Sequence, residues 1–153
     1  MKSDGLLRHA LVAFLLAAAV YALIYSVIEH SRTRKGPWTV AFTTKGSSPA
    51  LVVNQAKLGL TNAVILFSSL PAPTNTATLV FSSPRPVPFE VPFGQCIFMD
   101  STFLPGTLTF QLFGHELELL PRVLIIDHEE HPWVSGSTIA LPPAKPPTGA
   151  TER

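Results

Sequence analysis

The stretch ALVAFLLAAAVYALIYSVI, residues 10–28, holds nineteen consecutive residues without a charged side chain. As an α-helix it would extend about 28 Å, which is close to the hydrocarbon thickness of a bilayer. Arg8 and His9 precede the stretch, and Glu29 follows it. We therefore predict a transmembrane helix over residues 10–28, with a membrane anchor formed by Ala10, Leu15, Leu16, Val20, Leu23, Ile24 and Ile28.

Two other interpretations of this stretch are weaker. A cleaved signal peptide would start from Lys2 and Arg8 and use Val20-Tyr21-Ala22 as its cleavage motif. The apolar residues 23–28 would then become the exposed start of the mature protein, which is unfavourable. A buried core helix does not fit either, because the stretch is apolar around its whole circumference.

The charges that flank the stretch leave its orientation balanced. Lys2 and Arg8 lie on one side, and Arg32, Arg34 and Lys35 lie on the other. The short basic tail of residues 1–9 is typical of signal anchors. We predict a single-pass protein of the cell membrane whose C-terminal part is extracytoplasmic. In the basic juxtamembrane segment, residues 29–36, we expect the side chains of Arg32, Arg34 and Lys35 to contact lipid head groups.

Residues 37–141 carry the patterns of short β-strands. Trp38, Val40 and Phe42 alternate with smaller residues, and residues 107–119 form the clearest hairpin. About eight to ten such strands recur at a spacing of 8–12 residues, which is typical of an antiparallel β-sandwich. The sequence predicts an all-β domain, with immunoglobulin-like and jelly-roll topologies both open, preceded by one N-terminal transmembrane helix.

Several local features of this domain follow from composition. The apolar run Val123–Ile126 predicts a central strand buried on both faces. Residues 133–141 predict the last strand, and residues 142–153 a proline-rich disordered tail. Residues 85–92 contain too many prolines for a central strand, so we predict an edge strand or a connection there. A polyproline segment that binds a partner is the alternative interpretation.

Asp127-His128-Glu129-Glu130-His131 is the segment richest in candidate metal ligands. His128, His131, Asp127 and His115 are the candidates, and Glu118 joins them if its hairpin pairs with the following strand. Because Pro132 and neighbouring strands argue against a helix here, we interpret Asp127–Glu130 as an exposed acidic turn. We predict no metal, no cofactor and no catalytic residues. The lone Cys96 is expected to be a buried apolar residue, with a reactive thiol as the alternative.

Low charge is the domain's most unusual compositional feature. Between Gly46 and Gly114 only Lys57, Arg85, Glu90 and Asp100 are charged. No basic stripe is present, so we predict that the protein does not bind nucleic acid. Four phenylalanines that lie close together in sequence favour either a core or a surface for a partner: Phe89, Phe93, Phe98 and Phe103.

The leading functional prediction is a non-enzymatic, membrane-anchored β-sandwich, a protein-interaction or accessory component of the cell envelope. Its expected partners are membrane lipid and either another protein or a second copy of the chain. The second hypothesis is an anchored carbohydrate or small-ligand binding module that stacks its ligand on Trp133 or Trp38. The third is a metal-dependent enzyme around His128 and His131.

Overall fold

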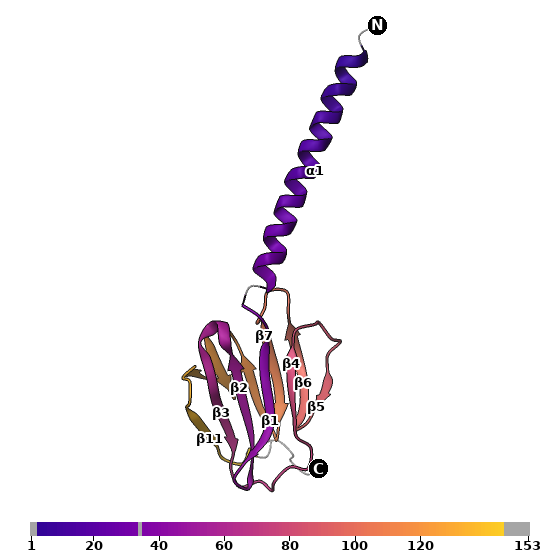
Figure 1. Cartoon of the computed structure of the whole chain (residues 1–153). Helices are drawn as coiled ribbons and strands as arrows, with labels where there is room; N and C mark the ends of the chain where they lie inside the picture. Colours follow the sequence, from indigo (N-terminus) through magenta and orange to yellow (C-terminus); the bar gives the residue numbers. More distant parts are fainter. Residues whose placement is uncertain (1–2, 34, 146–153) are drawn as a thin grey trace. The chain divides into compact units, whose positions relative to one another are not determined.

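A computed structural model describes residues 3–33 and 35–145, with the side chains of residues 3, 32 and 33 left out. The chain divides into two compact units, residues 1–34 and residues 35–153. The first unit is the helix α1 and the second is a β-domain (Figure 1). The two units are described separately below.

Helix α1 spans Ser3–Thr33 and contains the predicted anchor. Within its segment Asp4–Ser31 an 18-residue window reaches a mean hydropathy of 2.5, so the helix is long and apolar enough to cross a membrane, a criterion that a signal sequence also meets. All the predicted anchor side chains are exposed on the helix, as a membrane-spanning helix requires. The helix continues past residue 28, so the predicted juxtamembrane segment begins as helix. Arg34 lies outside the described residues.

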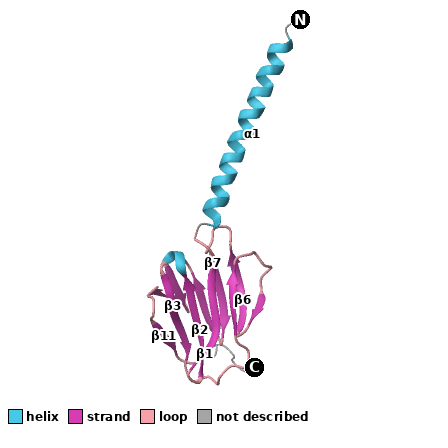
Figure 2. Cartoon of the chain, viewed as in Figure 1, coloured by secondary structure: helices cyan, strands magenta, loops and turns pink. Residues whose placement is uncertain are grey.

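The β-domain consists of two sheets, drawn as magenta arrows in Figure 2. Sheet A has five strands in the order β11 (Thr138–Leu141), β3 (Leu60–Phe67), β2 (Ser48–Gln55), β1 (Trp38–Lys45) and β4 (Ala77–Phe81). Sheet B has six strands in the order β10 (Glu129–Pro132), β9 (Val123–Ile126), β8 (His115–Leu119), β7 (Thr107–Leu112), β6 (Gly94–Asp100) and β5 (Phe89–Val91). A short 3-10 helix, η1 (Ala56–Leu58), connects β2 to β3.

The predicted all-β sandwich is confirmed, but its connections follow neither topology left open by the sequence. Sheet B is an uninterrupted antiparallel meander from β5 to β10. The described chain crosses between the sheets only from β4 to β5 and from β10 to β11. Immunoglobulin and jelly-roll domains exchange strands between sheets more often. Strand β11 pairs with β3 in parallel, because both strands begin at the same end of the sandwich, where Gly136 bonds to Thr61.

The core lies between the two sheets and follows the alternation in the sequence. Trp38, Val40 and Phe42 of β1 are buried, as predicted. They face sheet B, where Phe42 and Phe110 meet edge to face with centroids 6.0 Å apart. Burial of such apolar side chains is the main favourable contribution to the stability of a domain of this size.

Two predictions about the last strands were wrong. Val123–Ile126 is not buried on both faces: Leu124 and Ile126 are buried, whereas Val123 and Ile125 are only half-buried on the outer face. The predicted strand over residues 133–141 is shorter, because β11 begins at Thr138 and the preceding residues form a turn against β3.

The turn in the acidic segment is shorter than the predicted turn Asp127–Glu130. Only Asp127 and His128 form the turn, and Glu129–Pro132 is strand β10 at the edge of sheet B. A two-residue hairpin turn leaves Glu129 directly opposite Ile126, so pairing resumes at once.

The proline-rich region contains the edge strand β5, in agreement with the sequence prediction. The predicted tail has no regular element in residues 142–145, and its remaining residues 146–153 lie outside the described part of the chain. The four phenylalanines divide between the two interpretations. Phe93 is buried and Phe89 packs partly against the core, whereas Phe98 and Phe103 are about half exposed.

Candidate functional site

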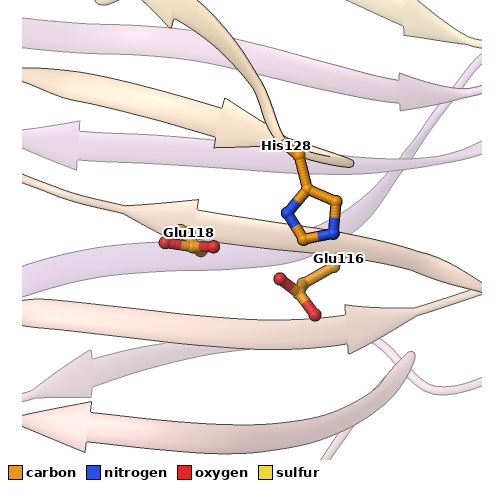
Figure 3. Close-up of side chains that lie close together, drawn as sticks. All are labelled: Glu116, Glu118 and His128. Atoms are coloured by element: carbon orange, nitrogen blue, oxygen red, sulfur yellow. The ribbon is translucent and has the colours of Figure 1, made fainter.

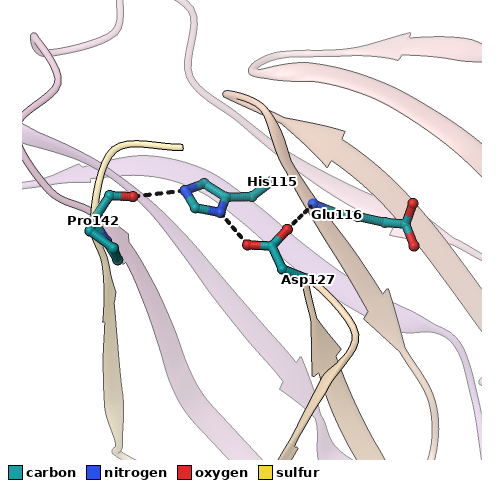
Figure 4. A network of polar contacts seen from close by, with 4 residues as sticks. All are labelled: His115, Glu116, Asp127 and Pro142. Atoms are coloured by element: carbon teal, nitrogen blue, oxygen red, sulfur yellow. Dashed lines mark hydrogen bonds and ion pairs between the residues drawn. The ribbon is translucent and has the colours of Figure 1, made fainter. Parts of the chain in front are cut away.

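The turn at Asp127 and His128 connects β9 to β10 with an unusual backbone. Both residues have positive φ, 50° and 70°, as a type I′ hairpin turn requires. Glycine and asparagine are the common residues there, and aspartate tolerates the conformation better than most. The Asp127 carboxylate fixes the turn, because its Oδ1 accepts the Glu116 amide proton at 2.9 Å (Figure 4).

His115 lies beneath this turn on the inner face of β8 and is almost fully buried. Its Nδ1 lies 2.6 Å from Asp127 Oδ2, and its Nε2 lies 2.8 Å from the carbonyl oxygen of Pro142 (Figure 4). A carboxylate oxygen and a carbonyl oxygen are both hydrogen-bond acceptors. Both contacts are therefore hydrogen bonds when the imidazole carries two protons. His115 thereby ties sheet B to the residue that follows β11 of sheet A.

Asp127 is ionised in this arrangement. Partial burial raises the pKa of its carboxyl, but the hydrogen bonds from His115 and the Glu116 amide and the nearby charges of His115 and His128 outweigh that effect. The pKa of Asp127 consequently lies below its ordinary value of 3.8. The His115–Asp127 contact is then a charge-assisted hydrogen bond across neighbouring strands.

A second cluster lies on the outer face of sheet B. Glu116 and Glu118 occupy alternate positions of β8, and the exposed His128 leans over them from the turn (Figure 3). Their potential ligand atoms all lie within 4.8 Å of one another. Ligands about 2.1 Å from a zinc ion in a tetrahedral shell are roughly 3.4 Å apart, which lies within this limit. Their chemistry, two carboxylates and an imidazole, suits a divalent cation.

The structure divides the candidate metal ligands of the acidic segment between the two faces of sheet B. His131 pairs with the buried Leu124, so it lies on the inner side of sheet B, whereas His128 contributes to the outer cluster. Asp127 and His115 pair with each other instead. Glu118 joins the outer cluster because its strand does pair with β9, as the sequence argument required. The sequence prediction did not include Glu116 among the candidate ligands. Its position two residues before Glu118 in the same strand indicates that both side chains lie on one face of the sheet.

Two hollows border the His115–Asp127 pair. The larger, about 730 Å³, opens between β10 and β11, and its lining combines ionisable side chains with apolar ones: Glu129, His131, Lys145, Ile139 and Leu141. The smaller, about 490 Å³, includes Gln95, Gln111 and Gly94. The backbone of Gly94 is close to its neighbour, since an added Cβ would lie 2.1 Å from the Gln111 carbonyl oxygen.

The tryptophans do not form an open ligand platform. Trp38 is completely buried, and its Nε1 donates to the Gly106 carbonyl at 3.0 Å. Trp133 packs against it with ring centroids 5.4 Å apart and donates to the Leu120 carbonyl at 2.7 Å. Stacking of a sugar on Trp38 is therefore excluded, because no face of its ring is accessible.

Cys96 is a core residue, as predicted. Its side chain is fully buried, and its Sγ lies 3.3 Å from the carbonyl oxygen of Phe98. Burial raises the pKa of the Cys96 thiol to about 11, against smaller opposing effects of hydrogen bonds and of the Arg85 charge. The thiol stays protonated at neutral pH and is correspondingly unreactive.

No protein-family model, curated protein or solved structure matches this chain. The functional argument therefore depends on the geometry of the chain itself.

Proposed function

We propose that the chain is a non-enzymatic single-pass membrane protein whose extracytoplasmic β-domain binds an extended segment of another protein along strand β4. Helix α1 supports the anchoring part of this proposal. It is 31 residues long, and its apolar segment exposes large hydrophobic side chains on all sides. Such a surface is stable in lipid and unfavourable in water.

The four edges of the two sheets carry the interaction part of the proposal. An edge strand presents unpaired backbone groups, and natural proteins block such edges with prolines, charges or short length. Strand β10 contains two glutamates and Pro132, and β5 has three residues between prolines. Strand β11 has four residues, is followed by Pro142 and Pro143, and receives a contact from the Lys45 ammonium at Thr138.

Strand β4 has none of these protections. Its five residues, ATLVF, contain no proline and no charge. Thr78 and Val80 are exposed on it, and Val80 keeps 57% of its surface accessible. A partner strand could continue sheet A there by main-chain hydrogen bonds, with its own side chains meeting Thr78 and Val80. This open edge is the single observation on which the proposal depends.

Site-specific photo-crosslinking of the full chain in its native membrane tests the proposal. A photoreactive residue in place of Val80 should give a covalent adduct of defined mass, and Thr78→Lys should abolish the adduct by placing a charge on the edge. A photoreactive residue in place of Gln111, exposed on sheet B, is the matched control and should give none.

The mass of the adduct separates the outcomes. An adduct with a different protein supports the proposal as stated, whereas one of twice the chain mass would replace the partner by a second copy. A monodisperse monomer in detergent with no Val80-specific adduct would overturn it.

A further inference from the structure

We propose that one end of the β-domain, the Trp38 end, is a lipid-facing surface that docks on the anionic head groups of the membrane holding α1. The Trp38 end comprises the loops gathered around Trp38: η1 with Gly59, residues 101–106, residues 120–122 and residues 133–137. This inference rests on the proposed anchoring of α1 and not on the partner strand at β4.

The loops of the Trp38 end form one cluster because Trp38 connects them. Its indole donates to Gly106 and packs on Trp133, whose indole donates to Leu120. The turn after Trp133 is joined to sheet A, where the Gly136 amide donates to the Thr61 carbonyl at 2.9 Å and the Ser135 hydroxyl donates to that of Gly59. Figure 2 shows η1 as the short cyan helix between β2 and β3.

Covalent connection keeps this end near the membrane. Helix α1 ends at Thr33, and β1 begins at Trp38. Five residue steps span at most roughly 18 Å, and the helical residues after Ile28 add about 7.5 Å. Whatever the direction of the linker, Trp38 stays within this reach of the end of the apolar run.

Exposed apolar side chains lie at the Trp38 end, one of them in a loop whose backbone is closely packed. Phe103 is 56% exposed between the exposed Thr102 and the buried Leu104, and Val134 is 51% exposed in the turn after Trp133. The loop of Phe103 is fixed because Gly106 has φ +71° and an added Cβ would lie 1.8 Å from the Asp100 carbonyl oxygen. A rigid aromatic at a loop tip loses little conformational entropy on entering the interfacial region.

The charges of the β-domain complement an anionic surface at the same end. Lys35, Lys57 and Arg122 are exposed there, and the carboxylates nearest to them are Asp100 at the end of β6 and the half-buried Glu118, one residue from the end of β8. The opposite end carries Glu116, Asp127 and Glu129. Basic residues near an anionic leaflet are attracted to it, whereas carboxylates are repelled.

A depth measurement on the full chain tests the inference. Thr102→Cys places a label beside Phe103, and Ser47→Cys places one in the β1–β2 turn at the opposite end. Cys96 is fully buried, so a thiol-reactive fluorophore should select the introduced cysteine. The labelled chains are reconstituted in phosphatidylcholine vesicles with about 30% phosphatidylglycerol, an anionic fraction large enough to set a negative surface potential. Quenching by head-group spin-labelled lipid is then measured.

The label at residue 102 should be quenched about threefold more than the label at residue 47, and less so in vesicles without phosphatidylglycerol, because the attraction is partly electrostatic. The single variant Phe103→Ser should lower the difference in quenching between residues 102 and 47. The double variant Lys57→Glu with Arg122→Glu should lower it as well. Lys45→Glu with Lys145→Glu, the same charge change outside the Trp38 end, should leave it unchanged.

Three results would overturn the inference. Equal quenching at residues 102 and 47 would exclude docking while α1 remains anchored. Quenching at residue 102 that is unchanged by Phe103→Ser and by the charge reversal would exclude it as well. Release of the chain by alkaline carbonate would exclude the anchor itself, and the inference with it. Anchoring and docking therefore fail in distinguishable ways.

Discussion

At one end of the β-sandwich Trp38 joins the two sheets through a buried indole, and at the other end His115 joins them through a buried imidazole. Trp38 donates one neutral hydrogen bond to Gly106 and packs against Trp133 with its ring tilted. His115 contacts Asp127 and Pro142 through both ring nitrogens. The Trp38 end is therefore closed mainly by apolar packing, and the His115 end by a polar network that includes a half-exposed carboxylate.

This difference indicates that the two ends respond to different conditions. Apolar burial does not change with pH, whereas a contact between a histidine and an aspartate depends on the protonation of both. The apolar end is the one joined to α1, and the ionisable end is farther along the strands from that connection. Four experiments test this difference between the two ends, and the largest effect is expected at Trp38.

Trp38→Ala should destabilise the β-domain by about 3–5 kcal/mol, because it leaves a large cavity and orphans the Gly106 carbonyl. This is a large part of the 5–15 kcal/mol that is typical of a whole domain. Denaturant unfolding of the full chain in detergent measures the loss. Trp133→Phe is the control, and it should cost less, since the ring contact is retained and only the bond to Leu120 is lost. Equal stability of Trp38→Ala and the parent would show that this end is not closed by packing.

His115→Ala should cost about 1–3 kcal/mol, the range for losing buried hydrogen bonds and leaving their partners without a donor. A double-mutant cycle with Asp127→Asn isolates the contact between the two side chains. A coupling of at least roughly 0.5 kcal/mol is expected, because the two side chains touch directly. If the losses of stability in His115→Ala and Asp127→Asn are additive, the His115 end is held by packing and not by this contact.

Lowering the pH should weaken the contact between Asp127 and His115 at the His115 end. The folded-state pKa of Asp127 is depressed, so its contribution to stability is fully present above the ordinary carboxyl value of 3.8 and is lost as the pH falls through the lower folded value. Urea unfolding midpoints of the parent and Asp127→Asn between pH 2.5 and pH 7 should converge at the acidic end. Asp100, at the Trp38 end, also has a lowered pKa because of hydrogen bonds within its own loop, so Asp100→Asn measures how much of the acid-induced loss comes from outside the His115 end. Parallel midpoint curves for the parent and Asp127→Asn would contradict the assignment.

The same contrast explains how much of the molecule the sequence could predict. Alternation of large and small residues indicated Trp38, Val40 and Phe42 as core, because a strand that packs on one face shows a period of two. The run Val123–Ile126 led to a wrong prediction of burial on both faces, because the residues on its outer face are apolar as well. On that outer face Ile125 lies between Glu118 and Glu130 of the neighbouring strands.

The polar end could be predicted only in part. His115, Asp127 and His128 could be named from the sequence as candidate ligands, but their grouping depends on a turn in which Asp127 and His128 both adopt a left-handed conformation. That turn carries Asp-His in place of Asn-Gly, so composition gave no signal of its type. The bond from His115 to Pro142 joins residues 27 positions apart, and no local pattern predicts such a contact.

The smallest effect is expected at His128, on the outer side of the His115 end. His128→Ala should change the free energy of unfolding by no more than about 0.5 kcal/mol, as for most exposed positions. A metal site would behave differently, because binding to the folded state alone raises stability with ligand concentration. Thermal melts of the parent and of His128→Ala, each with zinc and with a chelator, separate the two cases. His131→Ala is the control, since that side chain lies apart from Glu116 and Glu118. A melting temperature raised by zinc in the parent and in His131→Ala, but not in His128→Ala, would establish the outer cluster as a cation site and add a second condition to which this end of the sandwich responds.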